Sequence, residues 1–477
     1  MNSPPVPIPV LRMGTEYESL EQVEVQDHAD GTTLALLDQV NAGIVRRDLR
    51  GATNPLRELP IDRLLQICAE AGERFMEDEL PVADGRATQA AQEYIEALSA
   101  SSGLPHRLCR TNMEKIRTVL TSMEEVLRGL TRGMDLAVLD GGIGAQGGVG
   151  LCYAPTTERL GVVLPNNSPG VNSIWLPAVA LKTAVVLKPG SGEPWTPLRI
   201  LRALIAAGAP AGAFGYYPTD HEGAAAVLDG CGRALLFGDE RTTAAWAGDP
   251  RISLHGPGRS KVVIGPDEIE RWEEHLDLLV ESVAANGGRS CVNTSTILVT
   301  EKGDDVAEAL ARRLAEIEPA SPTDPEALLC AFPEHRIAEA IDASISRGTE
   351  QGARDCSLEA RGTPRLTRLD GGAYLRPTVV RCDDLDHPLA RTEFLFPFTS
   401  VVEVDAEALA EAVGSSLAVT ALSRDRRLTD ELVARGDIAR LHLGPLPTTR
   451  VDWGQPHEGN LFELLYTRRA LSRAQDW

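Results

Sequence analysis

The chain has 477 residues, a formal net charge of −22, 43% hydrophobic residues and 24% charged residues. This length is too great for one ordinary core and predicts two or three domains of a globular, water-soluble protein. The negative charge disfavours a nucleic acid partner, because an acidic surface repels phosphates. The longest apolar stretch, 174–187, contains Pro177 and Lys182, so no membrane span is expected.

The eight cysteines are scattered and form no CxxC or CxxH pair, which argues against a zinc site or a disulfide framework. The N-terminal sequence MNSPPVPIPVLRMG has no charged region followed by a long apolar one, so it does not resemble a secretory signal. Together these features favour a cytoplasmic protein.

In chain order, residues 1–55 are rich in proline and polar breaks and are expected to form a loose arm. Residues 58–135 repeat apolar residues at spacings of three and four, which predicts helices. From about 160, short β-branched runs that end in Gly or Pro alternate with helical segments. The runs are RLGVVLP, AVVLKPG, ALLFGD and KVVIGP. This alternation is typical of a parallel sheet with crossover helices.

A second α/β series follows Cys291, with STILVT and FTSVVEV as strands and DDVAEALARRLAEI as a helix. The expected fold class is therefore α/β, with two parallel-sheet domains and a small additional element. The expected divisions are an arm over 1–55, one α/β domain over 56–254, a second over 255–445, and a C-terminal segment over 446–477.

The glycine-rich stretch at 142–147, GIGAQG, matches G-x-G-x-x-G after an apolar run. A dinucleotide-binding turn of that kind must open a helix, so that the helix N-terminus faces the pyrophosphate. Here more glycines and a proline follow instead. We therefore interpret 142–147 as a connection rather than as a nucleotide site.

The stretch NGGRSC places Cys291 behind two glycines and just before the apolar run 297–299. Glycines allow close approach of a ligand to the backbone, so this cysteine is a candidate nucleophile; the alternative is an inert small residue at a strand start. Three other residues lie at the expected carboxyl ends of strands, where open α/β sheets bind ligands: Asn167, Lys188 and Gly238.

At this point the sequence resembles the aldehyde dehydrogenase superfamily. PNNSP is similar to the family's P-W-N-F-P turn, and PAVALKTAVVLKP to its P-A-L-A-x-G-N-x-V-V-x-K-P segment. GGRSC is similar to G-Q-x-C, GRSKVVIG to G-K-S-P-x-I-V, and TEFLFPFTSVVEV to E-E-I-F-G-P-V. The five motifs keep their order from about 158 to 425.

The resemblance implies that Cys291 attacks an aldehyde carbonyl as a thiolate and that Asn167, with the Cys291 backbone N–H, stabilises the oxyanion. Asn166 remains an alternative donor. Loss of hydride to NAD or NADP would leave a thioester on Cys291. The implied cofactor-binding residues are Pro165, Asn166, Lys188, Gly238 and Phe396.

The sequence also departs from the family pattern. His255 stands where members that hydrolyse the thioester usually carry a glutamate. We therefore favour exchange between an aldehyde and an acyl thioester, with coenzyme A or another thiol as co-substrate. The alternative is hydrolysis to a carboxylic acid, with His255 as general base.

Two further departures concern the cofactor. Phe394 replaces the glutamate that holds the nicotinamide ribose in the family, and Ser191 stands where an acidic ribose partner is common. Loss of that carboxylate makes NADP plausible beside NAD. A non-catalytic scaffold or binding subunit with this fold is a third interpretation.

The C-terminal stretch VDWGQPHEGNLFELLY contains Trp453, His457 and Phe462. In the family this region shapes the substrate entrance and bridges subunits, which implies a homodimer or homotetramer. No HExxH motif or carboxylate cluster accompanies His457, so no metal is expected. The expected partner is a small aldehyde or acyl thioester.

Overall fold

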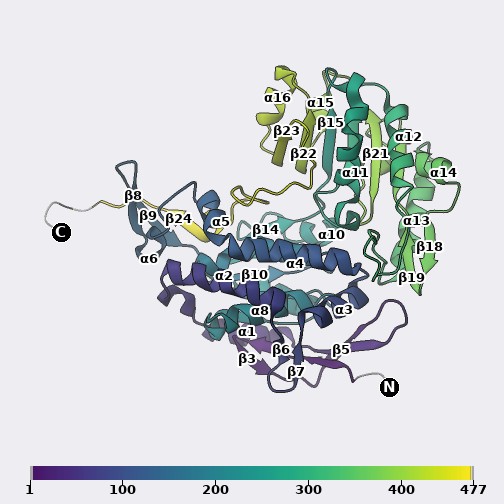
Figure 1. The fold of residues 1–477 in the computed structure, drawn as a ribbon. Coiled ribbons are helices and arrows are strands. Elements are labelled where there is room, and N and C mark those ends of the chain that lie inside the picture. Colours follow the sequence, from purple (N-terminus) through teal and green to yellow (C-terminus); the bar gives the residue numbers. More distant parts are fainter. Residues whose placement is uncertain (1–3, 473, 475–477) are drawn as a thin grey trace.

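The computed structural model describes residues 4–472 and 474, and it divides into two α/β lobes (Figure 1). The N-terminal lobe is built on a seven-stranded sheet. Its order is β14 (Ile252–His255), β13 (Arg233–Phe237), β10 (Arg159–Val163), β11 (Ala184–Lys188), β12 (Phe214–Tyr216), β2 (Val10–Arg12) and β3 (Thr15–Tyr17). The first five strands are parallel, whereas β2 and β3 join antiparallel.

The helices of this lobe include α1 (Ala42–Gly51), α2 (Ile61–Glu77), α3 (Ala91–Ser102), α4 (His106–Thr121), α5 (Met123–Leu130), α6 (Val138–Gly141), α7 (Pro177–Ala180), α8 (Trp195–Ala206), α9 (His221–Gly230) and α10 (Glu240–Ala244). In α2, buried residues recur at helical spacing, for example Ile61, Leu64 and Cys68, so one face packs into the core and the other faces solvent. The helices expected within 58–135 are therefore confirmed.

The second lobe also has a seven-stranded sheet. Its order is β17 (Arg354–Asp355), β20 (Thr378–Cys382), β21 (Phe398–Glu403), β16 (Thr294–Val299), β15 (Ser260–Ile264), β22 (Ser416–Leu422) and β23 (Ile438–Leu443). All but β17 are parallel. The helices of this lobe are α11 (Leu276–Ala284), α12 (Gly303–Leu314), α13 (His335–Glu350), α14 (Cys356–Arg361), α15 (Leu409–Ala412) and α16 (Arg426–Val433).

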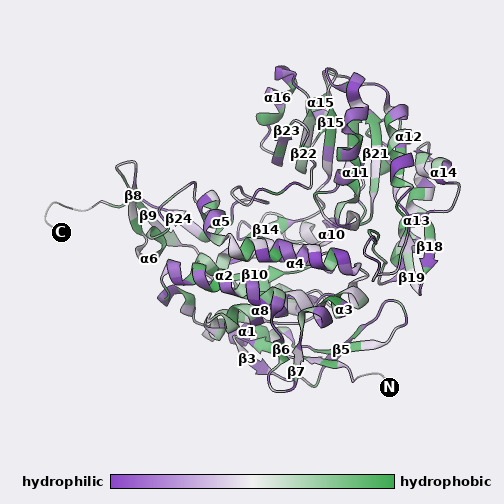
Figure 2. Ribbon diagram, in the orientation of Figure 1, coloured by the Kyte–Doolittle hydropathy of each residue, from purple (hydrophilic) through white to green (hydrophobic). Residues whose placement is uncertain are grey.

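Both sheets are apolar inside. In Figure 2 strand β21 is mostly green, whereas α4 and α12 show purple stretches beside green ones. All residues of β15, β16 and β22 are buried, which is typical of parallel strands covered on both faces. The expected α/β fold with two parallel-sheet domains is confirmed.

The first 55 residues differ from the expected loose arm. They form β1 (Val6–Ile8), β4 (Gln22–Gln26) and β5 (Thr33–Asp38), which make a separate small sheet, besides β2, β3 and α1. Val10 and Leu11 are fully buried. Strands of three residues are too short to show periodicity, and their stability comes from pairing with distant strands such as β12.

A third element projects from the N-terminal lobe. The stretch 142–147 lies in and around β8 (Ile143–Gln146), which forms a hairpin with β9 (Val149–Pro155). The C-terminal chain returns from the second lobe through α17 (Leu461–Leu465) and adds β24 (Tyr466–Arg468) to β9, as the yellow segment in Figure 1 shows. The glycines at 147 and 148 occupy the hairpin turn, and no helix opens there.

Two short hairpins complete the described fold, β6 (Leu80–Ala83) with β7 (Ala87–Gln89) and β18 (Leu366–Leu369) with β19 (Gly372–Leu375). Over the residues that the structure describes, no helix combines the length and the apolar character needed to cross a membrane. The chain passes from the first sheet to the second between His255 and Ser260, next to the candidate site.

Candidate active site

The turn before β16 positions Cys291. Asn286, Gly287 and Gly288 have φ values of 54°, 64° and 70°, a left-handed run that favours glycine. A Cβ on Gly288 would lie 2.2 Å from the backbone carbon of Phe396, so a larger residue would not fit. This tight turn places Cys291 against the backbone of Gly258, in the connection between the two sheets.

The turn before β15 supports Cys291 from the other side. A Cβ on Gly258 would lie 2.0 Å from the carbonyl oxygen of Cys291, so glycine is required here by close approach of two backbones. Ser260 Oγ donates a hydrogen bond of 2.8 Å to the same oxygen. The half-buried Cys291 side chain packs against Val292 and Ala418.

The Cys291 thiol lies in an environment that disfavours its charged form. Burial raises its pKa well above the usual range, and the carboxylates of Glu458 and Glu393 raise it further. Lys115 and the Cys291 backbone N–H act in the opposite direction. The thiol is therefore protonated near neutral pH, and attack on a carbonyl requires a base to take its proton.

Asn167 faces this turn, four residues after β10 ends. Its Nδ2 donates to the carbonyl oxygen of Arg289 at 3.3 Å, two residues before Cys291. An amide nitrogen carries two protons, so one remains for a ligand. Asn166 points elsewhere, because its Oδ1 accepts a bond of 3.0 Å from the Gly192 N–H. Of the two asparagines, the geometry brings Asn167 to the cysteine.

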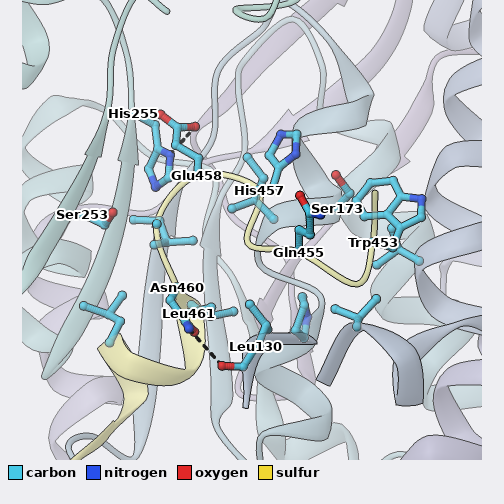
Figure 3. A pocket seen from close by; sticks show the side chains of 17 residues that line it. Leu130, Ser173, Ser253, His255, Trp453, Gln455, His457, Glu458, Asn460 and Leu461 are labelled. Carbon is cyan, nitrogen blue, oxygen red and sulfur yellow. Dashed lines mark hydrogen bonds and ion pairs between the residues drawn. The ribbon is translucent and has the colours of Figure 1, made fainter. Parts of the chain in front are cut away.

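His255 ends β14 and is buried. Its ring stacks on Phe237 with centroids 4.4 Å apart. Its Nδ1 lies 2.7 Å from Oε2 of Glu458, although the angle falls outside the hydrogen-bond range. Its Nε2 has no hydrogen-bond partner among the described residues. Figure 3 shows the ring and the carboxylate side by side.

His255 and Glu458 line a small cavity of about 60 Å³. Ser173 and Ile174 on the chain after Asn167 form one wall, and the C-terminal segment with Trp453 and His457 forms another. The remaining lining residues are largely apolar. A cavity of this size holds water or the end of a small molecule.

The candidate cofactor residues lie at the carboxyl ends of the first sheet. Lys188 is the last residue of β11 and is in register with Val163 of β10. Burial lowers its pKa, and the Asp220 carboxylate opposes that shift without reaching ion-pair distance in the described chain. A desolvated cation at this edge fits the ribose hydroxyls or a phosphate of a dinucleotide.

The other candidates also lie near this edge. Pro165 and Asn166 follow β10, and Gly238 directly follows β13. Phe396 is buried in contact distance of the Gly288 turn. Two carboxylates next to Gly238 already have partners: Asp239 caps α10 through the Thr242 N–H, and Glu240 pairs with Arg259.

Arg289, two residues before Cys291, anchors the turn. It is buried, donates to the carbonyl oxygens of Ser102 and Ala331, and lies over the ring of Phe332. It therefore holds the nucleophile turn against the N-terminal lobe. In the described residues no group of His, Cys, Asp or Glu side chains is arranged to hold a metal.

Sequence reasoning missed four charged residues of this region: Lys115, Glu393, Arg440 and Glu458. Glu393 accepts a bond of 2.6 Å from the Arg259 N–H, and burial raises its pKa to about 7. Glu458 directly follows His457, so the C-terminal motif contained the signal. Only the return of the chain to the N-terminal lobe brings Glu458 to His255.

Comparisons with known proteins give a consistent result. The model of the Aldehyde dehydrogenase family matches residues 82–450. A betaine aldehyde dehydrogenase of Cereibacter sphaeroides is 29% identical over 56% of this chain and 58% of its own length. A 2-hydroxymuconic semialdehyde dehydrogenase of a Pseudomonas species is 26% identical over 62% and 63%. The match thus spans about three fifths of these curated relatives.

Solved structures share the fold. The NAD-dependent benzaldehyde dehydrogenase of Corynebacterium glutamicum superposes with a TM-score of 0.75 and 18% identity, over 97% of each chain. The aldehyde dehydrogenase KauB of Pseudomonas aeruginosa gives a TM-score of 0.77 and 17% identity, over 97% of this chain and 96% of its own. At such identities the likeness establishes the fold.

Proposed function

Because the chain belongs to the aldehyde dehydrogenase family, we propose that it oxidises an aldehyde to a carboxylic acid through a thioester on Cys291. NAD or NADP would be the hydride acceptor, which is supported by the NAD+ complex of an indole-3-acetaldehyde dehydrogenase and by the NAD-dependent benzaldehyde dehydrogenase that share this fold. The observation that carries the hydrolytic version is the contact of 2.7 Å between His255 and Glu458.

The first step joins Cys291 to the substrate. The thiol releases its proton to solvent water, Sγ of the resulting thiolate bonds to the carbonyl carbon, and the electron pair of the C=O bond moves to oxygen. The free proton of the Asn167 amide and the Cys291 N–H are donors for that oxyanion. A nicotinamide dinucleotide, when bound, would supply the hydride acceptor for oxidation to the thioester.

The binding of that dinucleotide falls to residues at the carboxyl ends of the first sheet. Lys188 would bind the ribose hydroxyls or a 2′-phosphate, while the chain at Pro165 and Gly238 would lie along the cofactor. Phe396 would pack near the nicotinamide end. The desolvated Lys188, without a carboxylate at ion-pair distance in the described residues, supports this assignment.

The second step releases the acid. Nε2 of His255 has no hydrogen-bond partner among the described residues. It takes a proton from water as the water oxygen attacks the thioester carbon. The C–S bond then breaks and Cys291 leaves as the thiolate. Glu458 stabilises the imidazolium that forms, because its carboxylate lies beside Nδ1.

The acyl-thioester version, in which coenzyme A or another thiol takes the acyl group, differs only in this second step. The cavity beside His255 has a volume of about 60 Å³, which suits a water molecule better than the sulfur and chain of a large thiol, and this favours water as the acceptor. A scaffold that has lost turnover would not need the close backbone contacts that require glycine at 258 and 288 beside Cys291. We therefore propose that water hydrolyses the Cys291 thioester.

The test is NAD(P)H formation by the purified protein with a panel of aldehydes, with and without coenzyme A. We expect steady turnover without coenzyme A, none in Cys291→Ala, and a burst followed by slow turnover in His255→Gln. Turnover that requires coenzyme A would replace the hydrolytic version by the acylating one. Failure to bind NAD(P)H at all would favour the scaffold.

For assembly we propose a homodimer or homotetramer of a cytoplasmic protein. The projecting sheet of β8, β9 and β24 supports this, since Ile143 and Val149 on its hairpin are 44% and 57% exposed. Apolar side chains on a projecting hairpin are typical of a subunit contact. Light scattering should show more than one copy, and Val149→Asp should shift the mass towards the monomer.

A further inference from the structure

Two cations near Cys291 play no part in the chemistry above. Lys115 lies on α4, and its Nζ approaches to 3.5 Å of the position that a Cβ on Gly170 would take, three residues after Asn167. The same Nζ lies 5.8 Å from the ring centroid of Trp453, a residue that lines the cavity. Lys115 therefore faces the chain that leads away from the proposed oxyanion donor.

Arg440 approaches from the second lobe. It lies on β23 opposite Ala418 of β22, and Ala418 packs in the apolar cluster that contacts Cys291. Its side chain is 9% exposed. One guanidinium nitrogen donates to the carbonyl oxygen of Arg450 at 2.7 Å, and another lies 3.3 Å from Nδ1 of His457.

His457 and Trp453 connect the two cations. Their rings are nearly parallel, with centroids 6.2 Å apart, and both line the cavity beside Glu458. Burial, Lys115 and Arg440 all lower the pKa of His457, so this histidine is neutral and accepts from Arg440. Lys115, Trp453, His457 and Arg440, the cationic subsite, thus form one continuous group of side chains at the cavity.

The cationic subsite lacks a matching anion. Among the described residues no carboxylate lies within ion-pair distance of Lys115, and the Cys291 thiol and Arg440 are the neighbouring groups that affect its pKa. Arg440 has Glu458 and Asp452 in its surroundings, but neither reaches ion-pair distance in the described chain. Removal of a cation from water without a carboxylate partner is costly, and it lowers the pKa of Lys115 to about 8.

Several other buried cations of the protein have carboxylate or carbonyl partners. Arg365 pairs with Asp355 and Asp342, and Arg199 donates to three carbonyl oxygens. Lys182 pairs with Asp140.

We propose that the aldehyde which this enzyme oxidises carries a carboxylate at its far end, and that Lys115 and Arg440 bind that carboxylate. The inference rests on the proposed aldehyde oxidation and adds the substrate class. The aldehyde carbon would lie at Cys291 and Asn167, and the carboxylate would complete the cationic subsite. A cationic aldehyde would be repelled there.

A competing explanation is that the two cations only stabilise the Cys291 thiolate. In that case their removal would lower the rate of oxidation of all aldehydes equally, and it would also lower the rate at which iodoacetamide alkylates Cys291. Removal of a carboxylate-binding group instead changes the preference between substrates. The two explanations therefore give different results with a pair of aldehydes of matched length.

The experiment uses succinic semialdehyde and butanal, which share a four-carbon chain and differ in the terminal carboxylate. We expect the kcat/KM ratio of the first over the second to fall at least tenfold in Lys115→Met and in Arg440→Met. The ratio should recover in Lys115→Arg. Lys302→Met, which removes a cation from a distant surface pair with Glu270, should keep the wild-type ratio.

A binding measurement separates this proposal from the proposed function. Calorimetry should detect binding of succinic semialdehyde to Cys291→Ala and no binding to the Cys291→Ala, Lys115→Met double variant. This measurement does not depend on turnover. Binding without turnover in the wild type would contradict the oxidation and keep the subsite. An unchanged ratio in both single variants, or equal binding of the two aldehydes to Cys291→Ala, would overturn the carboxylate assignment.

Discussion

Nδ1 of His255 lies 2.7 Å from Oε2 of Glu458, which joins the last residue of β14 to the C-terminal segment that returns from the second lobe. The ring is fixed by its stacking on Phe237, and Nε2 is free of protein partners in the described structure. This is the arrangement that the proposed general base requires, with a carboxylate beside one ring nitrogen and the other nitrogen available for water.

Removal of this carboxylate should therefore slow thioester hydrolysis. We expect Glu458→Gln to lower steady-state turnover by about a hundredfold, at the lower end of general-base effects, while the initial burst of NAD(P)H stays close to one per site. Stopped-flow absorbance would measure both phases. A loss of the burst together with turnover would contradict this role, and Glu463→Gln, on the exposed surface, serves as the control.

The close approach of Gly258 to Cys291 gives a second prediction. A methyl group at 258 would lie 2.0 Å from the Cys291 carbonyl oxygen, so the two turns must separate. Gly258→Ala should cost about 1–3 kcal/mol of stability, as overpacking does, and should reduce turnover because Cys291 moves. Gly436→Ala, where a Cβ meets no atom within 4 Å, is the matched control. Equal activity of both variants would disprove the constraint.

Substitution of Lys188 tests whether the dinucleotide binds at the carboxyl ends of the strands of the first sheet. Lys188→Ala should raise the KM for the dinucleotide more than that for the aldehyde, because the cation lies at the end of β11 where the ribose is expected. Quenching of protein fluorescence by NAD(P)H should show the same loss of affinity without turnover. A larger effect on the aldehyde KM would remove Lys188 from the cofactor site.

Glu193 links stability to pH near this edge. Burial raises the pKa of its carboxyl from 4.5 to about 7. The folded state favours the protonated carboxyl. The contribution of Glu193 to the free energy of unfolding is therefore full below pH 4.5 and is lost as the pH rises to about 7. The total is about 3 kcal/mol for a shift of this size.

The measurement compares the wild type with Glu193→Gln by denaturant unfolding at pH 5 and pH 8. The variant does not titrate, so its stability relative to the wild type should rise between the two values. A constant difference would show that Glu193 is ionised at both pH values or exposed in the folded state.

Local sequence was sufficient for much of the fold. Apolar residues at helical spacing predicted α2 and α4, and β-branched runs that end in Gly or Pro predicted β10, β11 and β15. The expected carboxyl ends of strands also indicated Asn167 and Lys188 as candidate site residues, because parallel strands have their carboxyl ends at the same edge of the sheet. The first 55 residues were misjudged, since their short strands are stabilised by distant partners and carry no period.

The sequence by itself determined the family, the turn that presents Cys291, and the substitution of the usual glutamate by His255. These are properties of short contiguous segments, in which spacing alone carries the information. The tertiary structure decided that Glu458 contacts His255, that Lys115 lies beside Trp453, and that Arg440 contacts His457. Those contacts join residues far apart in the chain, and no local pattern encodes which distant side chains a buried charge will meet.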